Sequence, residues 1–251
     1  MEANNSHPRA RTFGSDLTNV HVDRPLKVQR PIVVSVEAAI GTGKSSLLRL
    51  IQQKEPTWVV VQEPVDKWQD INGHNLLDAF YGNLERYAFS FQTYCVLSRI
   101  EAVTTALQKC PQETPVVVLE RSWFSDRATF AEMLHKTGRI SDMEWNLYQE
   151  WYSFAVRNSP TIDGHLYLEC GTDTCMTRLR KRSRSEEVGV TSDYQRDLIT
   201  HHEDWLNGLN QSKVHRVNVD QDFLNDVERS EKMVETVRGF ISELRDQLHH
   251  A

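Results

Sequence analysis

Short β-branched runs alternate with longer amphipathic stretches from residue 31 onward, and this alternation constrains the fold more than any other feature of the sequence. Strands, mostly buried ones, are predicted at 32–37, 57–62, 114–120, 165–169 and 214–219. Helices are predicted at 44–54, 84–109, 141–158, 172–183, 191–208 and 223–248. The repeated strand–helix–strand order favours an α/β fold, with a five-stranded parallel sheet and helices on both faces.

Length and composition favour one domain at 31–251, preceded by a flexible tail at 1–30. A chain of 251 residues, of which 39% are hydrophobic and 25% charged, can bury a full core. The first thirty residues are polar and poor in large aliphatic side chains, which is typical of a disordered segment.

The net charge of -6 argues against nucleic acid or membrane as a partner, because both require a broad basic surface. The four cysteines lack the close pairs of a zinc site, and a chain of this size does not need a disulfide framework. A reducing compartment, the cytoplasm, is therefore predicted. A mitochondrial presequence stays open as an alternative, since the tail carries several arginines, although Asp16 and Asp23 interrupt it.

The stretch EAAIGTGKSS at 37–46 joins a predicted strand to a predicted helix and is typical of a phosphate-binding loop. Lys44 would reach the outer phosphates, Ser45 would offer its hydroxyl to magnesium, and the helix would direct its positive end at the anion. Ala38 stands where such a loop usually has Gly, but only a positive φ demands Gly there. The predicted phosphate-binding residues are Ala38, Ala39, Ile40, Gly41, Thr42, Gly43, Lys44, Ser45 and Ser46. The alternative is a chance Gly-Lys-Ser at the start of a helix.

Further polar motifs follow the predicted strands, where ligands of a parallel sheet bind. EPVDKW (63–68) follows the second strand, ERSWFSDR (120–127) ends the third, and DQDF (220–223) follows the fifth. Within the helix at 84–109, the residues Gln92, Cys95 and Arg99 are spaced i, i+3 and i+7, so they share one face. A Gln amide offers a donor and an acceptor side by side, which matches the edge of a nucleobase.

These motifs, together with FQTY (91–94), LSR (97–99) and the arginine-rich segment before SEE (185–187), resemble the deoxynucleoside kinase family, in its deoxycytidine and deoxyguanosine kinase branch. The likeness runs from about residue 31 to residue 248, with the motifs in order; this chain departs at Ala38, Trp123 and Thr191. The resemblance implies a P-loop kinase fold with an arginine-rich lid. It also implies transfer of the γ-phosphoryl group of ATP, with Mg²⁺, to the 5′-hydroxyl of a deoxynucleoside, a step of nucleotide salvage.

The resemblance also implies a part for each residue of the reaction centre. Glu63 would be the general base, and Arg121 would stabilise charge as the phosphoryl group moves. Ser45 and Glu120 would hold Mg²⁺. The donor would meet the lid residues Arg178, Arg182 and Arg184, and its base would lie against Asp222 and Phe223. The alternatives are a loop carboxylate for Glu63, an ion pair between Glu120 and Arg121, and a solvated charged face for the lid.

The nucleoside pocket is predicted from the same motifs. Phe91 and Phe130 would stack on the base, unless they are ordinary core. Tyr81 and Glu187 correspond to the family residues that hold the 3′-hydroxyl. Arg99 and Asp126 match the charged pair that this branch places beside the base, which predicts deoxycytidine and purine deoxynucleosides over thymidine. The remaining predicted contacts are Glu63, Trp68, Leu77, Phe80, Gln92, Cys95 and Arg121.

Two other functions stay open from the sequence. A nucleoside monophosphate kinase shares the loop, the sheet and the lid, but it needs free cations in the acceptor pocket. A non-catalytic nucleotide-binding switch would fit a phosphate loop weakened by Ala38. Family likeness also suggests a homodimer built on the helices at 84–109 and 141–158, where Trp145, Tyr148, Trp151 and Phe154 follow helical spacing or form core.

Overall fold

The computed structural model describes residues 30–184, 187 and 189–249. The tail predicted at 1–30 therefore lies, except for Arg30, outside the described residues, as do the last two residues of the predicted domain. None of the helices in the described part of the chain combines the length and hydrophobicity that crossing a bilayer requires.

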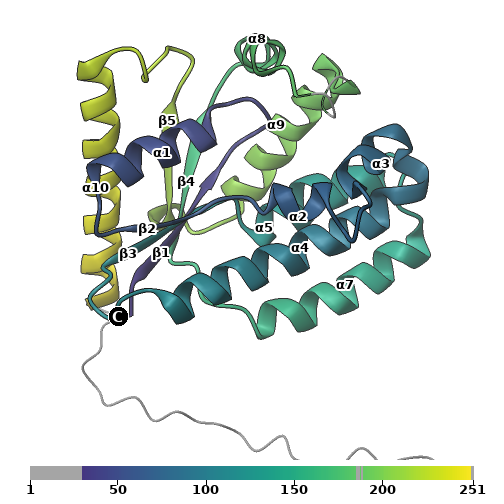
Figure 1. The fold of residues 1–251 in the computed structure, drawn as a ribbon, viewed down its shortest axis with the longest axis horizontal. Coiled ribbons are helices and arrows are strands. Elements are labelled where there is room, and N and C mark those ends of the chain that lie inside the picture. Colours follow the sequence, from purple (N-terminus) through teal and green to yellow (C-terminus); the bar gives the residue numbers. More distant parts are fainter. Residues whose placement is uncertain (1–29, 185–186, 188, 250–251) are drawn as a thin grey trace, which may run out of the picture.

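Five parallel strands form the central sheet, as predicted (Figure 1). They are β1 (Ile32–Glu37), β2 (Val59–Val61), β3 (Val116–Glu120), β4 (Gly164–Glu169) and β5 (Val214–Asn218), in the spatial order β2-β3-β1-β4-β5. The three inner strands are buried almost throughout, whereas the edge strands β2 and β5 are half-buried. The β-branched runs thus form strands that are covered on both faces.

Helices cover the two faces of the sheet in separate layers. On one face, α1 (Lys44–Lys54) and α10 (Val227–His249) pack on the side chains of Ile32, Val34 and Val36. On the other face, α4 (Leu84–Lys109) and α7 (Asp142–Arg157) pack side by side over Val33 (Figure 1). The alternation of β1 side chains between two hydrophobic clusters follows from the period of two in a strand.

The remaining helices surround the carboxyl ends of the strands. They include α8 (Thr172–Arg182) and α9 (Ser192–Asn207), which were predicted from the sequence. The short turn η3 (Gln211–Lys213), which was not predicted, lies instead at the amino end of β5. The sequence also did not predict α2 (Val65–Gln69), α3 (Leu76–Gly82), α5 (Trp123–Ser125), the π-helical turn η1 (Asp126–Ala131) and α6 (Glu132–Lys136). The helix predicted from residue 223 begins instead at Val227, because Asp222 caps the preceding turn by accepting from the backbone N–H of Leu224 (2.8 Å).

Candidate active site

The phosphate loop adopts the backbone that its glycines permit. Gly41 has φ 78° and Gly43 has φ 114°, both in the left-handed region. A Cβ on Gly41 would lie 2.7 Å from the carbonyl oxygen of Cys175, so a side chain has no room there. Ala38 is not among the described non-glycine residues with positive φ, and its methyl group is fully buried. The substitution for Gly at this position is therefore compatible with the loop.

Lys44 lies inside this loop. Its Nζ donates to the carbonyl oxygens of Ala39 (3.0 Å) and Ala38 (3.4 Å). Burial, followed by the nearby charge of Arg121, lowers the pKa of Lys44 to about 7. An anion held by the loop would favour the charged ammonium, because an opposite charge at close range stabilises the ionised form.

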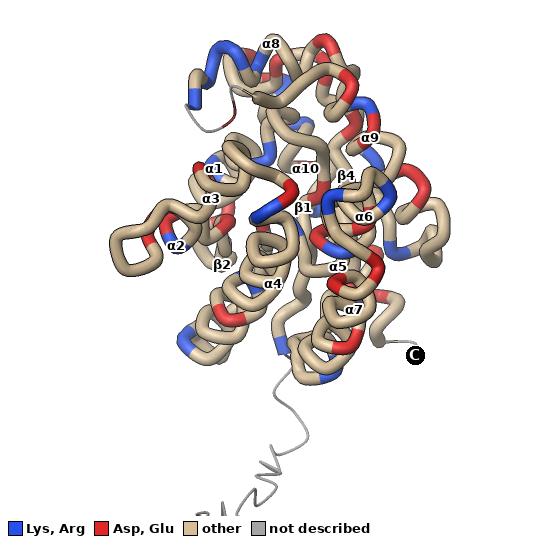
Figure 2. The backbone as a smooth tube through the Cα atoms, turned by 90° about the vertical axis from the view of Figure 1, so that its right-hand side faces the viewer, with Lys and Arg blue, Asp and Glu red and all other residues tan. Residues whose placement is uncertain are grey.

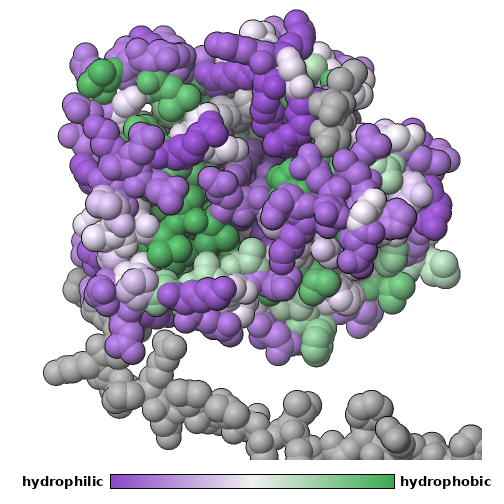
Figure 3. All heavy atoms as spheres, viewed as in Figure 1, coloured by the Kyte–Doolittle hydropathy of each residue, from purple (hydrophilic) through white to green (hydrophobic). Residues whose placement is uncertain are grey.

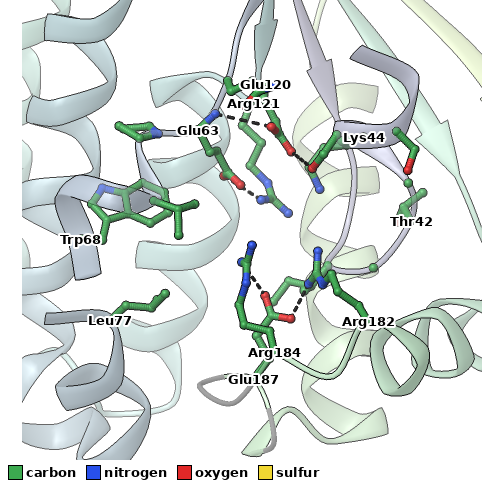
Figure 4. Close-up of a pocket in the computed structure, with 18 of the residues that line it drawn as sticks. Thr42, Lys44, Glu63, Trp68, Leu77, Glu120, Arg121, Arg182, Arg184 and Glu187 are labelled. Carbon is green, nitrogen blue, oxygen red and sulfur yellow. Dashed lines mark hydrogen bonds and ion pairs between the residues drawn. The ribbon is translucent and has the colours of Figure 1, made fainter. Parts of the chain in front are cut away.

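The carboxylate of Glu63 lies between two arginines at the centre of the cavity (Figure 4). Its Oε1 accepts from Arg121 Nη1 (2.9 Å) and from Arg99 Nη2 (3.1 Å). Burial alone would raise the pKa of Glu63, but the charges of Arg121, Arg99 and Lys44 lower it well below its ordinary range. Glu63 is thus ionised at neutral pH, and its carboxylate is held between the two guanidinium groups.

The main chain fixes the direction of the Arg121 side chain. Arg121 has φ 64°, a left-handed conformation that a non-glycine residue adopts at a cost of about 1–2 kcal/mol. Its N–H donates to the carbonyl oxygen of Val36 (3.0 Å), and its Nη2 donates to that of Ala38 (2.8 Å). The guanidinium therefore joins the phosphate loop to Glu63.

Arg99 and Asp126 form a bidentate pair deep in the same cavity. Arg99 Nε lies 2.8 Å from Asp126 Oδ2, and Arg99 Nη2 lies 3.1 Å from Oδ1. Arg99 Nη1 donates to the carbonyl oxygen of Glu120 (2.7 Å). Burial opposes the charged guanidinium, yet the charges of Asp126 and Glu63 raise the pKa of Arg99 above its ordinary value. Both groups are almost fully buried, so their geometry is fixed by packing.

Ser45 and Glu120 meet beside the phosphate loop. Ser45 Oγ donates to Glu120 Oε1 (2.5 Å), while Glu120 Oε2 accepts from the backbone N–H of Glu63 (3.4 Å). The pair brings together a hydroxyl and a carboxylate, the hard oxygen donors that Mg²⁺ prefers. These two residues fit a magnesium ion bound against donor phosphates.

A cavity of about 1090 Å³ joins the phosphate loop, the two arginines and an aromatic wall (Figure 4). Phe91 stacks on Phe80 at 4.4 Å between ring centroids, and its edge faces Trp68. Arg121 lies over the ring of Phe130, 4.8 Å from the centroid. Gln92, Cys95 and Arg99 line the cavity together, as their spacing on one helix face predicted.

The lid arginines face the cavity from α8 and the segment that follows it. Arg182 Nη2 contacts Glu187 Oε2, and Arg184 Nη1 lies 3.1 Å from Glu187 Oε1 (Figure 4). The blue segments of α8 in Figure 2 show this local concentration of Lys and Arg in an acidic chain. Arg178 is bound differently: it donates to the carbonyl oxygens of Thr42 (2.9 Å) and Val219 (2.7 Å), so it braces the phosphate loop.

The cavity contains most of the residues predicted from the sequence. Its lining includes Ile40, Gly41, Thr42, Gly43, Lys44, Ser45, Ser46, Glu63, Trp68, Leu77, Phe80, Tyr81, Phe91, Gln92, Cys95, Arg99, Glu120, Arg121, Asp126, Phe130, Arg178, Arg182, Arg184, Glu187, Asp222 and Phe223. Ala38 and Ala39 do not line it, and they contribute only the carbonyl oxygens described above.

The sequence reasoning missed Tyr194, which lines the cavity from the first turn of α9. Burial raises the pKa of its hydroxyl above the ordinary value. The sequence did offer one signal for this residue, because an aromatic side chain follows soon after the arginine-rich segment. The two other departures from the family pattern leave the cavity intact: Trp123 packs in the core, and Thr191 caps α9 by accepting from the N–H of Tyr194 (3.2 Å).

Known proteins of one family are similar to this chain in sequence. The family model described as deoxynucleoside kinase matches residues 34–242. Deoxycytidine kinase 2 of Gallus gallus is 33% identical over 240 residues, covering 83% of this chain and 90% of its own length. The probable deoxycytidine kinase of Fowlpox virus is 37% identical over 216 residues, covering 84% and 88%. The mitochondrial deoxyguanosine kinase of Xenopus laevis is 31% identical over 254 residues, covering 90% and 95%.

Proposed function

The chain belongs to the deoxynucleoside kinase family, and on this premise we propose that Glu63 is the base that receives the 5′-hydroxyl proton. The protein is a deoxynucleoside kinase, and ATP is the phosphoryl donor that the family implies. The observation that carries our assignment is the position of the Glu63 carboxylate, which faces the cavity between the phosphate loop and the aromatic wall (Figure 4).

The geometry supports a reaction driven by positioning and charge. A carboxylate held by two arginines orients the attacking hydroxyl, and in a loose transition state it takes the proton late, so a low pKa does not prevent this role. Arg121 contacts both Glu63 and the loop carbonyl of Ala38, so its charge lies where the phosphoryl group would pass.

Donor binding is assigned to the phosphate loop, the lid and a magnesium ion. Lys44 and the loop N–H groups would hold the phosphates, and Arg182 and Arg184 would close on them from the end of α8 and the segment that follows it. Ser45 and Glu120 would hold Mg²⁺, which neutralises phosphate charge when bound. Asp222 and Phe223 would meet the base of the donor, since a Cβ on Gly43 would lie 3.7 Å from the Phe223 ring.

Substrate choice is assigned to Arg99 and Asp126. Their fixed bidentate pair can hydrogen-bond to an amino or carbonyl group of cytosine or a purine, and it occupies the space that a thymine methyl group needs. We therefore expect deoxycytidine and purine deoxynucleosides to be favoured over thymidine. Tyr81 and Glu187 would hold the 3′-hydroxyl of the sugar.

A panel of acceptors with ATP and magnesium tests the assignment. Deoxycytidine, deoxyadenosine and deoxyguanosine should be phosphorylated with higher kcat/KM than thymidine. dCMP should be a poor acceptor, because Glu63 and Asp126 already neutralise the arginines of the acceptor side. Thymidine as the best substrate would refute the role of Arg99 and Asp126, and efficient use of dCMP would favour the monophosphate kinase.

We also propose a homodimer built on α4 and α7. Of the four residues noted in the sequence, Tyr148 is fully buried and both tryptophans pack against the core, whereas Phe154 is 63% exposed. Met143 and Leu147 on α7 and Leu97 on α4 are also exposed. Figure 3 shows hydrophobic side chains along the lower right edge, where α7 lies in this view. Sedimentation of Phe154→Asp beside the unchanged protein tests the proposal, and equal masses for the two would contradict it.

Cytoplasmic localisation stays a proposal that rests on the cysteines. All four are free thiols, which suits a reducing compartment. Fractionation of cells that make the full chain tests it, and recovery with mitochondria would contradict it.

A further inference from the structure

Two thiols flank the turn between β4 and α8, directly beside the phosphate loop. Cys170 follows β4 and is half-buried, whereas Cys175 lies in the first turns of α8 and is fully buried. Cys175 Sγ lies 3.4 Å from Thr42 Oγ1 in the loop and 3.9 Å from the carbonyl oxygen of Cys170. The loop therefore rests on the helix start that carries Cys175.

Arg178 connects the second thiol to the same loop. Its Nη1 lies 3.5 Å from Cys170 Sγ and also donates to the carbonyl oxygen of Thr42 (2.9 Å). The two cysteines thus contact the loop through different atoms of Thr42, one directly and one through a guanidinium. A chemical change at either sulfur would therefore alter one of the contacts that hold Thr42 in place.

The two sulfurs also interact with each other. A hydrogen bond from Cys170, opposed by burial and supported by hydrogen bonds from Thr42 and Gln195, lowers the pKa of Cys175 to about 6. The hydrogen bond to Cys175 and burial raise the pKa of Cys170, so Cys170 is the thiol of the pair and Cys175 accepts its proton. Cys170 can become the attacking thiolate by passing that proton to Cys175, with Arg178 Nη1 3.5 Å from its Sγ to stabilise the charge.

We propose that Cys170 and Cys175 form a modification site, a dithiol that exchanges with a small-molecule disulfide of the glutathione type and closes into an intrachain disulfide. Closure requires the sulfurs to approach to about 2.05 Å, which withdraws Cys175 from Thr42. The site is a property of the thiols alone. Only its effect on donor binding rests on the proposed role of the phosphate loop.

The exchange proceeds in two displacements. The Cys170 thiolate attacks one sulfur of the small disulfide, whose S–S bond breaks and releases one thiolate, leaving Cys170 in a mixed disulfide. The Cys175 thiolate then attacks Cys170 Sγ, the mixed S–S bond breaks, and the second small thiolate leaves. The departing thiolates take up the protons given up by the two cysteines. Two protein thiols are oxidised, and one small disulfide is reduced to two thiols.

The burial of the two cysteines fits these roles. Cys170 is the accessible member, so it meets the reagent, whereas Cys175 needs only to reach Cys170 from inside the protein. Cys110 stands apart from the pair, because it is half-buried at the end of α4 and its Sγ contacts only the carbonyl oxygen of Leu107 (3.3 Å) among the hydrogen bonds described. It is therefore replaced by serine in the test, so that it does not react with the reagent.

The test uses the reduced full chain carrying Cys110→Ser, treated with oxidised glutathione, and mass spectrometry after alkylation. We expect this protein to lose two alkylatable thiols, to retain no glutathione, and to give a peptide that links 170 to 175. With Cys175→Ser added, one glutathione should stay attached at residue 170, because the resolving thiol is missing. With Cys170→Ser added, neither product should form. A stable mixed disulfide on Cys170 when Cys175 is present, or unchanged thiols, would overturn the proposal.

The effect on the loop is measured separately. Binding of ATP to the oxidised protein should weaken by about tenfold, the change expected from loss of one hydrogen bond to a charged group, and dithiothreitol should restore it. The Cys170→Ser protein should show no such response to the oxidant. If the disulfide forms and ATP affinity is unchanged, the thiols are not coupled to the loop, whereas the chemistry of the pair and the kinase assignment are unaffected.

Discussion

The acceptor side of the cavity and its lid differ in how their charges are held. On the acceptor side, Arg99 and Asp126 have side chains 3% and 4% exposed, and Glu63 lies between two guanidinium groups. On the lid, the side chains of Arg182 and Arg184 are 37% and 33% exposed, although Glu187, which both contact, is only 8% exposed. The charges of the acceptor side are therefore buried on both partners, whereas on the lid only the carboxylate is buried.

This difference has an energetic reason. Removing one partner of a buried ion pair leaves an uncompensated charge, which costs about 3–5 kcal/mol. An ion pair with a partly solvated cation contributes less than a fully buried pair. We therefore expect the lid arginines to be held less firmly than the charged groups of the acceptor side. Four substitutions test this contrast.

The largest effect is expected for Glu63→Gln. The amide keeps the shape of the side chain but cannot accept the proton, so kcat should fall by about 10²–10⁴-fold while ATP affinity is retained. Steady-state kinetics and equilibrium binding measure the two quantities. Glu85→Gln on the exposed end of α4 is the control and should leave both unchanged. Full turnover in Glu63→Gln would refute the role of Glu63 as the base.

The next largest effect is expected for Asp126→Asn, and it should be mainly a loss of stability. It leaves Arg99 buried with only Glu63 as a charged partner, so the free energy of unfolding should fall by about 3 kcal/mol. Chemical denaturation measures this loss. Asp142→Asn, at a side chain 96% exposed, should change stability by less than about 1 kcal/mol. Equal losses for the two would remove the contrast between buried and exposed charge.

Glu37→Gln tests a buried charge near the acceptor side through the pH dependence of the free energy of unfolding. Glu37 is fully buried, with Oε1 3.8 Å from His165 Nδ1. Burial alone would raise its pKa, but the proximity of His165 lowers it to about 2. Because this value is below the ordinary 4.5, the carboxylate stabilises the fold above pH 4.5, and the contribution disappears as the pH falls toward 2.

The substitution should therefore cost about 3 kcal/mol at pH 7 and about 1 kcal/mol less at pH 4. Denaturation curves at the two pH values measure the gap, which is the difference in free energy of unfolding between the variant and the unchanged protein. Glu243→Gln, on the exposed face of α10, should show no gap at either pH. A gap for Glu37→Gln that widens in acid would contradict the lowered pKa.

The smallest effect should come from the lid. Arg182→Ala should raise KM for ATP by about tenfold with little change in stability, and added salt should reduce the difference because the charges are solvated. Arg180→Ala, on the same helix but exposed and outside the cavity lining, is the matched control. If Arg182→Ala destabilises the fold as strongly as Asp126→Asn, the lid is as firmly built as the pocket.

The sequence predicted the parts of this protein that local pattern determines. Runs of β-branched residues identified all five strands, and the Gly-Lys-Ser stretch identified the loop, because strand periodicity and glycine requirements act over a few neighbours. The short helices α2 and α3 were missed, since a helix of five to seven residues forms through its packing rather than its periodicity.

Long-range contacts account for the other differences. The sequence placed Arg178 with the two other lid arginines, but the fold brings Thr42 and Val219 to it, so Arg178 braces the loop. Tyr194 enters the cavity only because α9 packs beside α8. Neither the contacts of Arg178 nor the packing of α9 against α8 can be predicted from the spacing of residues along the chain.

The left-handed backbone of Arg121 links the architecture of the sheet to the chemistry of the pocket. Its N–H extends the pairing of β1 and β3 one residue past Glu120, and its side chain turns back to Glu63. The same residue thus ends the β1–β3 pairing and holds the carboxylate of Glu63. Shortening or lengthening the third strand by a single residue would turn this side chain to the opposite face of the sheet, so we expect insertions here to be tolerated far less than in the surface loops.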